Sequence, residues 1–286
     1  ADAADPLKPP SPEVVDALQR RGLRSRARDV GDIVAPNAEG YATMPDGGEI
    51  MYRLFGRPDA PHKALLIMGF NSDCSLWRPI IEAAATDHAA ADIEMCVYDN
   101  RGTGGSSDPP CNLGRPWTCD DFADDAASLV SHLGWGAAYH VVGVSMGGMI
   151  AQRFALKHGR SMVSLTLLVT HPGGFYSVQL SGVRLLEEID ALGPDIDPDV
   201  LTDKMMEVLF GPRTLQDPER RKLHREALRA RQLTRRFSTK TSSKAHSSAV
   251  MRHYVRNEDL LRIRAHGMPV LAILGTHDNL VNPEGT

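Results

Sequence analysis

The chain has 286 residues, of which 42% are hydrophobic and 24% are charged, and its formal net charge is −4. This is the composition of an ordinary globular protein, so it excludes a collagen-like, disulfide-dense or generally disordered chain. The small negative charge gives no reason to expect a nucleic-acid partner, and 4 cysteines are too few for a disulfide-stabilised secreted module.

Residues 1–38 are predicted to be an N-terminal extension with one short helix. Ser11 suits the N-cap of this helix and Gly22 suits its end. The stretch 20–28 is rich in arginine, as organelle transit peptides are, but acidic residues precede it, and such peptides avoid them. No apolar run reaches the roughly 18 residues that a membrane-spanning helix needs. We expect an intracellular, cytoplasmic protein, and organelle targeting stays open.

Residues 39–171 are predicted to form the first part of an α/β core. A Pro-Asp-Gly-Gly turn between two β-prone runs indicates a hairpin over 39–56. Four apolar runs then predict strands buried on both faces, at 64–68, 93–98, 139–142 and 163–169. Helical patterns separate these runs, at 75–86, 120–133 and 149–157. Short apolar strands that alternate with helices predict a mostly parallel sheet with helices on both faces.

Residues 172–262 interrupt this alternation, because they have helical periodicity without a convincing strand. They are predicted to form an inserted helical cap, or lid, and the core resumes in 263–286 with a buried strand at 270–274. The segment from Arg213 to Arg256 contains 13 Lys and Arg against 3 Asp and Glu. A solvated helix face is the favoured interpretation of this charge, and contact with anionic lipid or an acidic substrate is the alternative.

The most informative motif is Gly143-Val144-Ser145-Met146-Gly147. A G-x-S-x-G pentad is short enough to occur by chance, but this one follows a predicted strand and begins a predicted helix. Such a sharp turn strains the serine and lifts its hydroxyl to the carboxyl edge of the sheet, at the N-terminus of a helix. Gly143 and Gly147 fit this interpretation because side chains there would collide where strand and helix approach each other.

With these motifs the chain resembles the α/β-hydrolase superfamily, in the branch that has a helical cap inserted after the sixth strand. It is most similar to uncharacterised eukaryotic hydrolases of the esterase or lipase type. The resemblance runs from about residue 40 to the end of the chain and implies the α/β-hydrolase fold. Besides the serine turn, it rests on three segments that each follow a predicted strand: Met-Gly-Phe at 68–70, Asp-Asn-Arg-Gly-Thr-Gly-Gly-Ser at 99–106 and Gly-Thr-His-Asp at 275–278.

The resemblance also assigns roles to these residues. Ser145 would be the nucleophile, and Asp278, in the usual place of the triad acid, would orient a histidine. The backbone N–H groups of Phe70 and Met146 would stabilise the oxyanion. Residues 99–106 are expected to shape the floor of the site without taking part in the reaction.

The catalytic histidine is missing from this pattern. The triad order in this fold is Ser, acid, His, and no histidine follows Asp278. We therefore predict a C-terminally truncated form that lacks the last strand, the last helix and the base, and that retains at most residual activity. His171 is a candidate substitute base because it follows a predicted strand at the same sheet edge as Ser145. The other histidines are interpreted as ordinary polar residues.

These residues favour a serine hydrolase that cleaves a carboxylic ester or a related acyl bond through an acyl-enzyme. Serine rather than aspartate at the turn argues against epoxide hydrolase or dehalogenase chemistry. Aminopeptidase, lactonase and thioesterase activities stay open, because substrate choice would lie in the cap. A non-catalytic ligand-binding or receptor-like module is the alternative from another class, and the missing histidine favours it.

We expect a small-molecule substrate and no cofactor. The cysteines and histidines show no spacing typical of a zinc site, and the glycines at 102–105 do not begin a helix as a dinucleotide-binding motif requires. Cys111 and Cys119 flank a loop, and a reduced state is expected for them, although pairing stays open.

Overall fold

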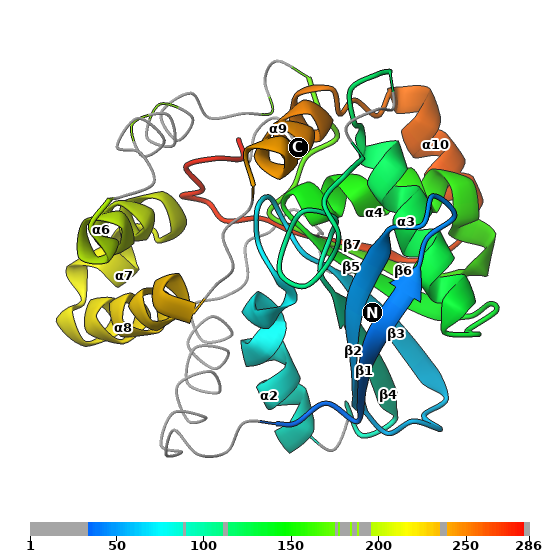
Figure 1. Ribbon diagram of the computed structural model, residues 1–286, viewed down its shortest axis with the longest axis horizontal. Helices are drawn as coiled ribbons and strands as arrows, with labels where there is room; N and C mark the ends of the chain where they lie inside the picture. Colours follow the sequence, from blue (N-terminus) through cyan, green and yellow to red (C-terminus); the bar gives the residue numbers. More distant parts are fainter. Residues whose placement is uncertain are drawn as a thin grey trace, which may run out of the picture.

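The computed structural model describes residues 34–87, 90–110, 114–174, 177, 184, 188, 196–234 and 239–282. The predicted helix at 11–22 lies outside these residues. A single seven-stranded sheet with the order β1-β2-β4-β3-β5-β6-β7 forms the centre of the described chain (Figure 1). Its strands are β1 (Ala38–Thr43), β2 (Glu49–Gly56), β3 (His62–Ile67), β4 (Ile93–Tyr98), β5 (Tyr139–Val144), β6 (Met162–Leu168) and β7 (Val270–Ile273).

The first two strands form the predicted hairpin and are antiparallel, and β2 also pairs antiparallel with β4. The hairpin turn closes through a hydrogen bond from the Met44 N–H to the Gly48 carbonyl oxygen, and Gly47 adopts the positive φ of 85° that this turn requires. All other neighbouring strands are parallel. The predicted fold class, a mostly parallel α/β sheet, is therefore confirmed.

The helices that follow β3, β4 and β5 begin at residues that suit helix starts. The predicted helix at 75–86 is a 3-10 turn, η1 (Cys74–Trp77), followed by α2 (Arg78–Thr86), with a proline in the first turn of α2. The helix α3 (Cys119–His132) has a capping box between Thr118 and Asp121. The helix α4 (Met146–His158) begins directly after Ser145 and leads into a 3-10 turn, η3 (Gly159–Ser161).

These helices cover the two faces of the sheet with separate apolar cores. Figure 1 shows α3 and α4 on one side and α2 on the other. One core joins Phe122 of α3 and Ile150 of α4 to strand residues such as Leu65, all of which are fully buried. The other core packs Trp77 and Ile81 against the opposite face of the sheet. Burial of this apolar surface is the main stabilising contribution of such a layered domain.

The burial of the last strand differs from the prediction. β7 was expected to be buried on both faces, but Val270, Leu271 and Ile273 are each at least 50% exposed. The reason is its place in the sheet: β7 pairs only with β6, and no described helix packs closely over it. β6 is likewise only partly buried, and Val163 is 38% exposed.

The predicted cap region, residues 172–262, contains five described helices. Figure 1 shows α6 (Pro198–Leu209), α7 (Pro212–Gln216) and α8 (Pro218–Thr234) as a group beside the sheet. The helix α9 (Lys240–Met251) lies closer to the sheet, and α10 (Asn257–Ala265) packs against α4 of the core. The boundaries of a separate cap domain stay a prediction.

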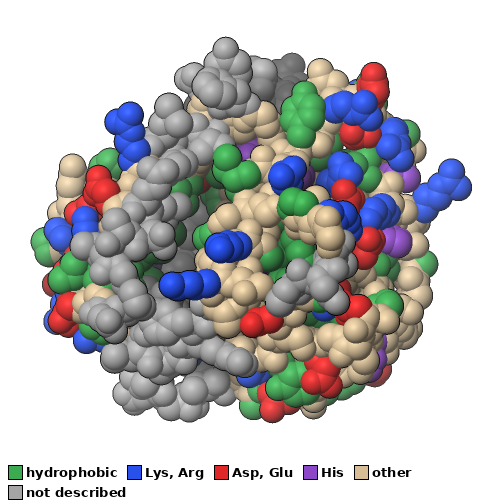
Figure 2. Space-filling view, turned by 45° about the horizontal axis from the view of Figure 1, so that its top comes forward, with side chains coloured by type: hydrophobic (Ala, Val, Ile, Leu, Met, Phe, Trp, Pro, Cys, Tyr) green, Lys and Arg blue, Asp and Glu red, His purple; other side chains and the backbone are tan. Residues whose placement is uncertain are grey.

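Part of the positive charge of the segment 213–256 is neutralised by acidic residues of α6. Arg225 forms ion pairs with Asp199 and Asp203, and Arg229 also pairs with Asp199. On the face shown in Figure 2, Lys and Arg side chains are spread over the described surface and acidic side chains lie among them. These pairs agree with the interpretation as a solvated helix face, and lipid contact stays a prediction. Among the described helices, none combines the length and the apolar character needed to cross a bilayer.

Candidate active site

The parallel strands bring four predicted site segments to one edge of the sheet. Ile67 of β3 pairs with Gly143 of β5, Val144 pairs with Leu168 of β6, and Leu168 pairs with Ile273 of β7. Because these strands run in the same direction, the residues that follow them emerge at the same carboxyl edge. These are the segments that contain Phe70, Ser145, His171 and Asp278.

Ser145 occupies a strained turn between β5 and α4. Its backbone has φ 54° and ψ −122°, a conformation that a non-glycine residue rarely adopts and that costs about 1–3 kcal/mol. The turn is held from several directions. The Ser145 N–H donates to the Leu168 carbonyl oxygen at 2.9 Å, and its own carbonyl oxygen accepts from Gly148 N–H at 2.8 Å and from Thr170 Oγ1 at 2.8 Å. The surrounding core therefore imposes the strain on the serine.

Close backbone contacts explain the glycines around Ser145. A Cβ atom on Gly143 would lie 2.3 Å from the Gly147 carbonyl oxygen, and one on Gly147 would lie 2.1 Å from the Ile67 carbonyl oxygen. A Cβ atom on Gly69 would lie 3.7 Å from Ser145 Oγ. The turn is thus packed directly on the end of β3, and the segment that contains Phe70 runs beside the serine hydroxyl.

The predicted oxyanion donors are two backbone N–H groups close to the Ser145 turn. Among the described residues, neither the Phe70 N–H nor the Met146 N–H has a hydrogen-bond partner. Met146 is the first residue of α4, where the helix dipole favours negative charge. Donors arranged in this way are able to stabilise a developing oxyanion, and the assignment of these two residues stays a prediction.

The loop after β4 contacts the segment after β3 and holds it in place. Asn100 Nδ2 donates to the Met68 carbonyl oxygen at 2.8 Å, and the buried Asp99 carboxylate accepts from the N–H groups of Cys74 and Gly105. The buried Arg101 guanidinium pairs with Asp125 of α3. These contacts agree with a structural role for residues 99–106, and their place as the floor of the site stays a prediction.

Asp278 lies in a turn after β7. Its Oδ1 accepts hydrogen bonds from the N–H groups of Leu280 and Val281, both at 2.8 Å. The side chain is half-buried, and its own N–H donates weakly to the Gly275 carbonyl oxygen at 3.3 Å. The carboxylate therefore stabilises its own turn through Oδ1.

His171 is buried near Asp278, but it does not pair with Ser145. Burial lowers the pKa of His171, and the Asp278 carboxylate opposes this shift. The ring Nδ1 accepts a hydrogen bond from the Gly173 N–H at 3.0 Å, so a neutral ring carries its proton on Nε2. Within the described part of the chain, no hydrogen bond joins this ring to Ser145 or to Asp278. The role of substitute base stays a prediction.

Comparisons with known proteins agree with this fold. The sequence pattern of the family described as alpha/beta hydrolase fold matches residues 65–286. The chain belongs to this family. A poly(3-hydroxyalkanoate) depolymerase of Ectopseudomonas oleovorans is 33% identical over 119 residues, which are 41% of this chain and 38% of the depolymerase. The chain therefore matches well under half the length of that curated relative.

Solved structures extend the likeness to most of this chain. An esterase from Rhodococcus sp. ECU1013 has a TM-score of 0.63 and 25% identity, with 85% of this chain and 82% of the esterase covered. The enol-lactonase from Burkholderia xenovorans LB400 also has a TM-score of 0.63, at 23% identity, with 86% and 85% covered. The second likeness shows the shared fold alone.

His246 differs most from the expectation of an ordinary polar residue. It is completely buried on α9, where its ring contacts the loop after β3 and the loop after β4. Its position in a basic and polar stretch gives no sign of burial. A weak signal is the spacing of small residues on the same helix, because Ser242, Ala245 and Ala249 are buried with it.

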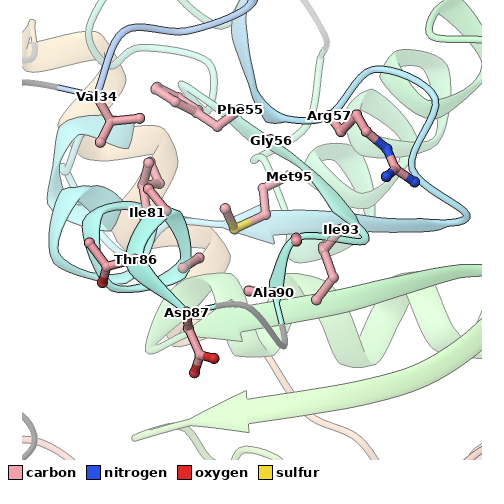
Figure 3. Close-up of a pocket in the computed structure, with 13 residues that line it drawn as sticks. Val34, Phe55, Gly56, Arg57, Ile81, Thr86, Asp87, Ala90, Ile93 and Met95 are labelled. Carbon is pink, nitrogen blue, oxygen red and sulfur yellow. The ribbon is translucent and has the colours of Figure 1, made fainter.

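Other features of the protein lie away from this edge of the sheet. A cavity of about 280 Å³ lies between α2 and the strands β2 and β4 (Figure 3). Its apolar lining includes Phe55, Ile81 and Ile93, and Ile93 begins β4 whereas the site edge lies at the other end of that strand. Among the described residues, no group of His, Cys, Asp and Glu is placed to hold a metal ion. Cys119 is a free, buried thiol, and Cys111 lies outside the described residues.

Proposed function

We propose that this hydrolase is a serine hydrolase that cleaves a carboxylic ester or a related acyl bond through Ser145. The observation that carries the proposal is the strained Ser145 turn at the N-terminus of α4, beside two N–H groups that lack partners among the described residues. A strained, glycine-enclosed serine with adjacent free donors has the chemistry of a nucleophile and its oxyanion hole.

The proposed reaction has two steps. Ser145 Oγ attacks the carbonyl carbon while a histidine accepts the hydroxyl proton, and the N–H groups of Phe70 and Met146 donate to the oxyanion. The histidine then protonates the leaving alcohol. A water molecule, deprotonated by the same histidine, attacks the acyl-enzyme, and the histidine then returns this proton to Ser145 Oγ as the bond between Oγ and the acyl carbon breaks and the acid is released. Asp278 holds the histidine in the required tautomer.

The identity of the base separates two versions of this proposal. In one version the base is His171, and in the other it is a different histidine. If His171 were the base, its Nδ1 would have to exchange the Gly173 N–H for the Asp278 carboxylate. Substituting His171 by Ala would then abolish turnover, whereas a base elsewhere leaves it within a few-fold of wild type.

The substrate class is proposed from the relatives. A depolymerase named for a polyester and an esterase are both similar to this chain, which supports an ester substrate. Lactones and aminoacyl amides are the remaining alternatives. A panel of p-nitrophenyl esters, a lactone and an aminoacyl p-nitroanilide would rank the three classes by kcat/KM.

A fluorophosphonate probe tests the nucleophile directly. We expect covalent labelling of Ser145 and loss of both labelling and ester hydrolysis in Ser145→Ala, with a fall in kcat of at least about 10³-fold. Ser131→Ala, which changes an exposed serine of α3, is the matched control and should retain labelling. Equal labelling of Ser145→Ala and wild type would contradict the proposal.

A ligand-binding module without turnover is the second candidate. The hydrogen bond that occupies His171 Nδ1 favours it, because this ring is not arranged to deprotonate Ser145. Folded protein that resists the probe but binds esters without hydrolysing them would support this candidate.

A further inference from the structure

Asn71 follows the predicted oxyanion donor Phe70 and has an unfavourable backbone conformation. Its φ of 46° lies in the left-handed region, which is uncommon for residues other than glycine, although asparagine adopts it more readily than most. Such a conformation persists only where the surroundings hold it. The contacts that hold Asn71 therefore also decide how the Phe70 segment runs past Ser145.

The helix α9 supplies these contacts. The Asn71 N–H donates to His246 Nδ1 at 3.2 Å, and Asn71 Nδ2 donates to Ser243 Oγ at 3.1 Å. The Phe70 ring also packs edge-on against the His246 ring, with 5.9 Å between the centroids. Two residues of one helix thus hold both the backbone and the side chains of the 70–71 segment.

The same imidazole reaches the loop after β4 on its other side. His246 Nε2 lies 2.7 Å from the Arg101 carbonyl oxygen, and a carbonyl only accepts, so Nε2 carries the proton. Nδ1 is then the acceptor for the Asn71 N–H. Only the neutral Nε2–H tautomer satisfies both contacts, and burial lowers the pKa of His246 to about 4, which keeps the ring neutral at physiological pH.

α9 itself is attached firmly to the core. Ser242 Oγ donates to Asp108 Oδ1 at 2.7 Å, and Ser248 Oγ donates to the Trp117 carbonyl oxygen at 2.8 Å. The His246 ring also lies 5.0 Å from the Phe122 ring of α3, centroid to centroid. The helix is thus a fixed support, against which the 70–71 segment is held.

We propose that His246 is a positioning residue that holds the Phe70–Asn71 segment of the predicted oxyanion hole against the Ser145 turn, through its Nδ1 contact with the Asn71 N–H. The kinetic part of this inference rests on the proposed function, whereas the contact itself does not. Ser243 has the same role to a smaller degree, because it holds only the Asn71 side chain.

Two substitutions of His246 test the contacts of Nδ1 and Nε2 separately. In His246→Asn the shorter amide places its oxygen near the position of Nδ1, so it still accepts from Asn71 but no longer reaches Arg101. In His246→Gln the longer amide places its nitrogen near the position of Nε2, so it still donates to Arg101 but lacks the acceptor for Asn71. Both variants leave one buried contact unmade, so their losses of stability should be similar.

Amide hydrogen exchange tests the contact without reference to catalysis. The Asn71 amide should exchange at least about 10-fold faster in His246→Gln than in wild type, and within about 3-fold of wild type in His246→Asn. Equal exchange of this amide in wild type and His246→Gln would overturn the inference. The measurement stands even if the chain proves to have no hydrolase activity.

Ester hydrolysis tests the positioning role. We expect His246→Gln to lower kcat by about 10- to 100-fold with KM nearly unchanged, because an oxyanion donor acts mainly in the transition state. His246→Asn should lie within about 5-fold of wild type. Ser243→Ala should fall between the two, and Ser247→Ala, which changes an exposed serine of the same helix, should match wild type. Equal loss of kcat in the Asn and Gln variants would reject the positioning role, and hydrolysis that persists in Ser145→Ala would reject the proposed function instead.

Discussion

The turns that contain Ser145 and Asp278 follow parallel strands of one sheet, but different forces hold them. The Ser145 turn is enclosed by β3, β6 and α4, and backbone atoms lie where side chains of Gly143 or Gly147 would be. The Asp278 turn follows an exposed edge strand and is stabilised by hydrogen bonds from its own next residues to its own carboxylate. The first geometry depends on the whole core, and the second depends on a local turn.

This difference has a consequence for the roles of the two residues. The proposed nucleophile Ser145 would have to be placed to within a fraction of an ångström of its electrophile, and a strained, fully supported turn suits this role. An acid that only orients another side chain tolerates more freedom. The following predictions test how far the two turns differ.

Glycine substitutions should separate the two turns most clearly. Gly147→Ala should destabilise the protein by about 3 kcal/mol or more, because the new Cβ would lie 2.1 Å from the Ile67 carbonyl oxygen. Gly275→Ala, at the start of the Asp278 turn, should change stability by no more than about 0.5 kcal/mol, since its nearest contacts are at 3.7 Å. Urea denaturation of both variants measures the difference. Similar losses would show that the acid turn is as tightly packed as the serine turn.

Truncation of strand side chains should show the same contrast. Ile67→Ala removes a fully buried side chain of β3 and should cost about 2–5 kcal/mol of unfolding free energy. Leu271→Ala changes a side chain of β7 that is 54% exposed, and it should cost less than about 1 kcal/mol. Thermal unfolding followed by circular dichroism gives both values, and a large loss in Leu271→Ala would mean that β7 is covered in solution.

Low pH should decrease the free energy of unfolding, because histidines are buried on the Ser145 side of the site. Burial lowers the pKa of His246 to about 4 and that of His253 to about 3, below the value of 6.5 for an exposed histidine. Between pH 6.5 and these lowered pKa values, the unfolded chain binds more protons than the folded chain. The contribution of the neutral rings to the free energy of unfolding is therefore fully present above about pH 6.5 and is lost as the pH falls. For His246 the loss approaches about 3 kcal/mol near pH 4. His246→Gln should flatten this part of the pH profile of unfolding, and an unchanged slope would contradict the assignment.

The smallest effect on stability is expected from charges on the exposed edge. Leu271→Lys and Ile273→Lys place lysines on β7, where both side chains are at least 50% exposed, so stability should change little. An exposed apolar edge strand favours pairing with other chains, and lysine opposes this pairing. Light scattering at increasing concentration should therefore show less self-association in the double variant than in wild type. Lysines placed on the antiparallel hairpin, at the other end of the sheet, serve as the control.

The sequence analysis predicts the strands and the Ser145 turn well because both depend on short-range patterns. Apolar runs of four to seven residues followed by glycine or polar segments indicate parallel strands wherever they lie in the sheet. The prediction that β7 is buried is wrong, because an edge strand and a central strand have the same apolar sequence pattern. Burial depends on which neighbours are present, and the run at 270–274 contains no information about them.

The contacts of His246 were missed for a related reason. Its partners Asn71 and Arg101 lie 175 and 145 residues away along the chain, so no local pattern connects them. The predicted roles of Phe70, Met146 and Asp278 come from the family resemblance and stay predictions. Only the three-dimensional arrangement shows that a helix within the predicted cap region also holds the backbone next to the serine.

The order of the strands has a consequence for how this protein is made. β3 pairs with β4 on one side and with β5 on the other, and β5 is synthesised more than seventy residues after β3. During translation, therefore, one apolar edge of β3 stays open until residues 139–144 have left the ribosome. Non-local parallel pairing of this kind is slow and exposes surfaces that chaperones bind. The Ser145 turn follows β5 directly, so it takes its final conformation only after that closure.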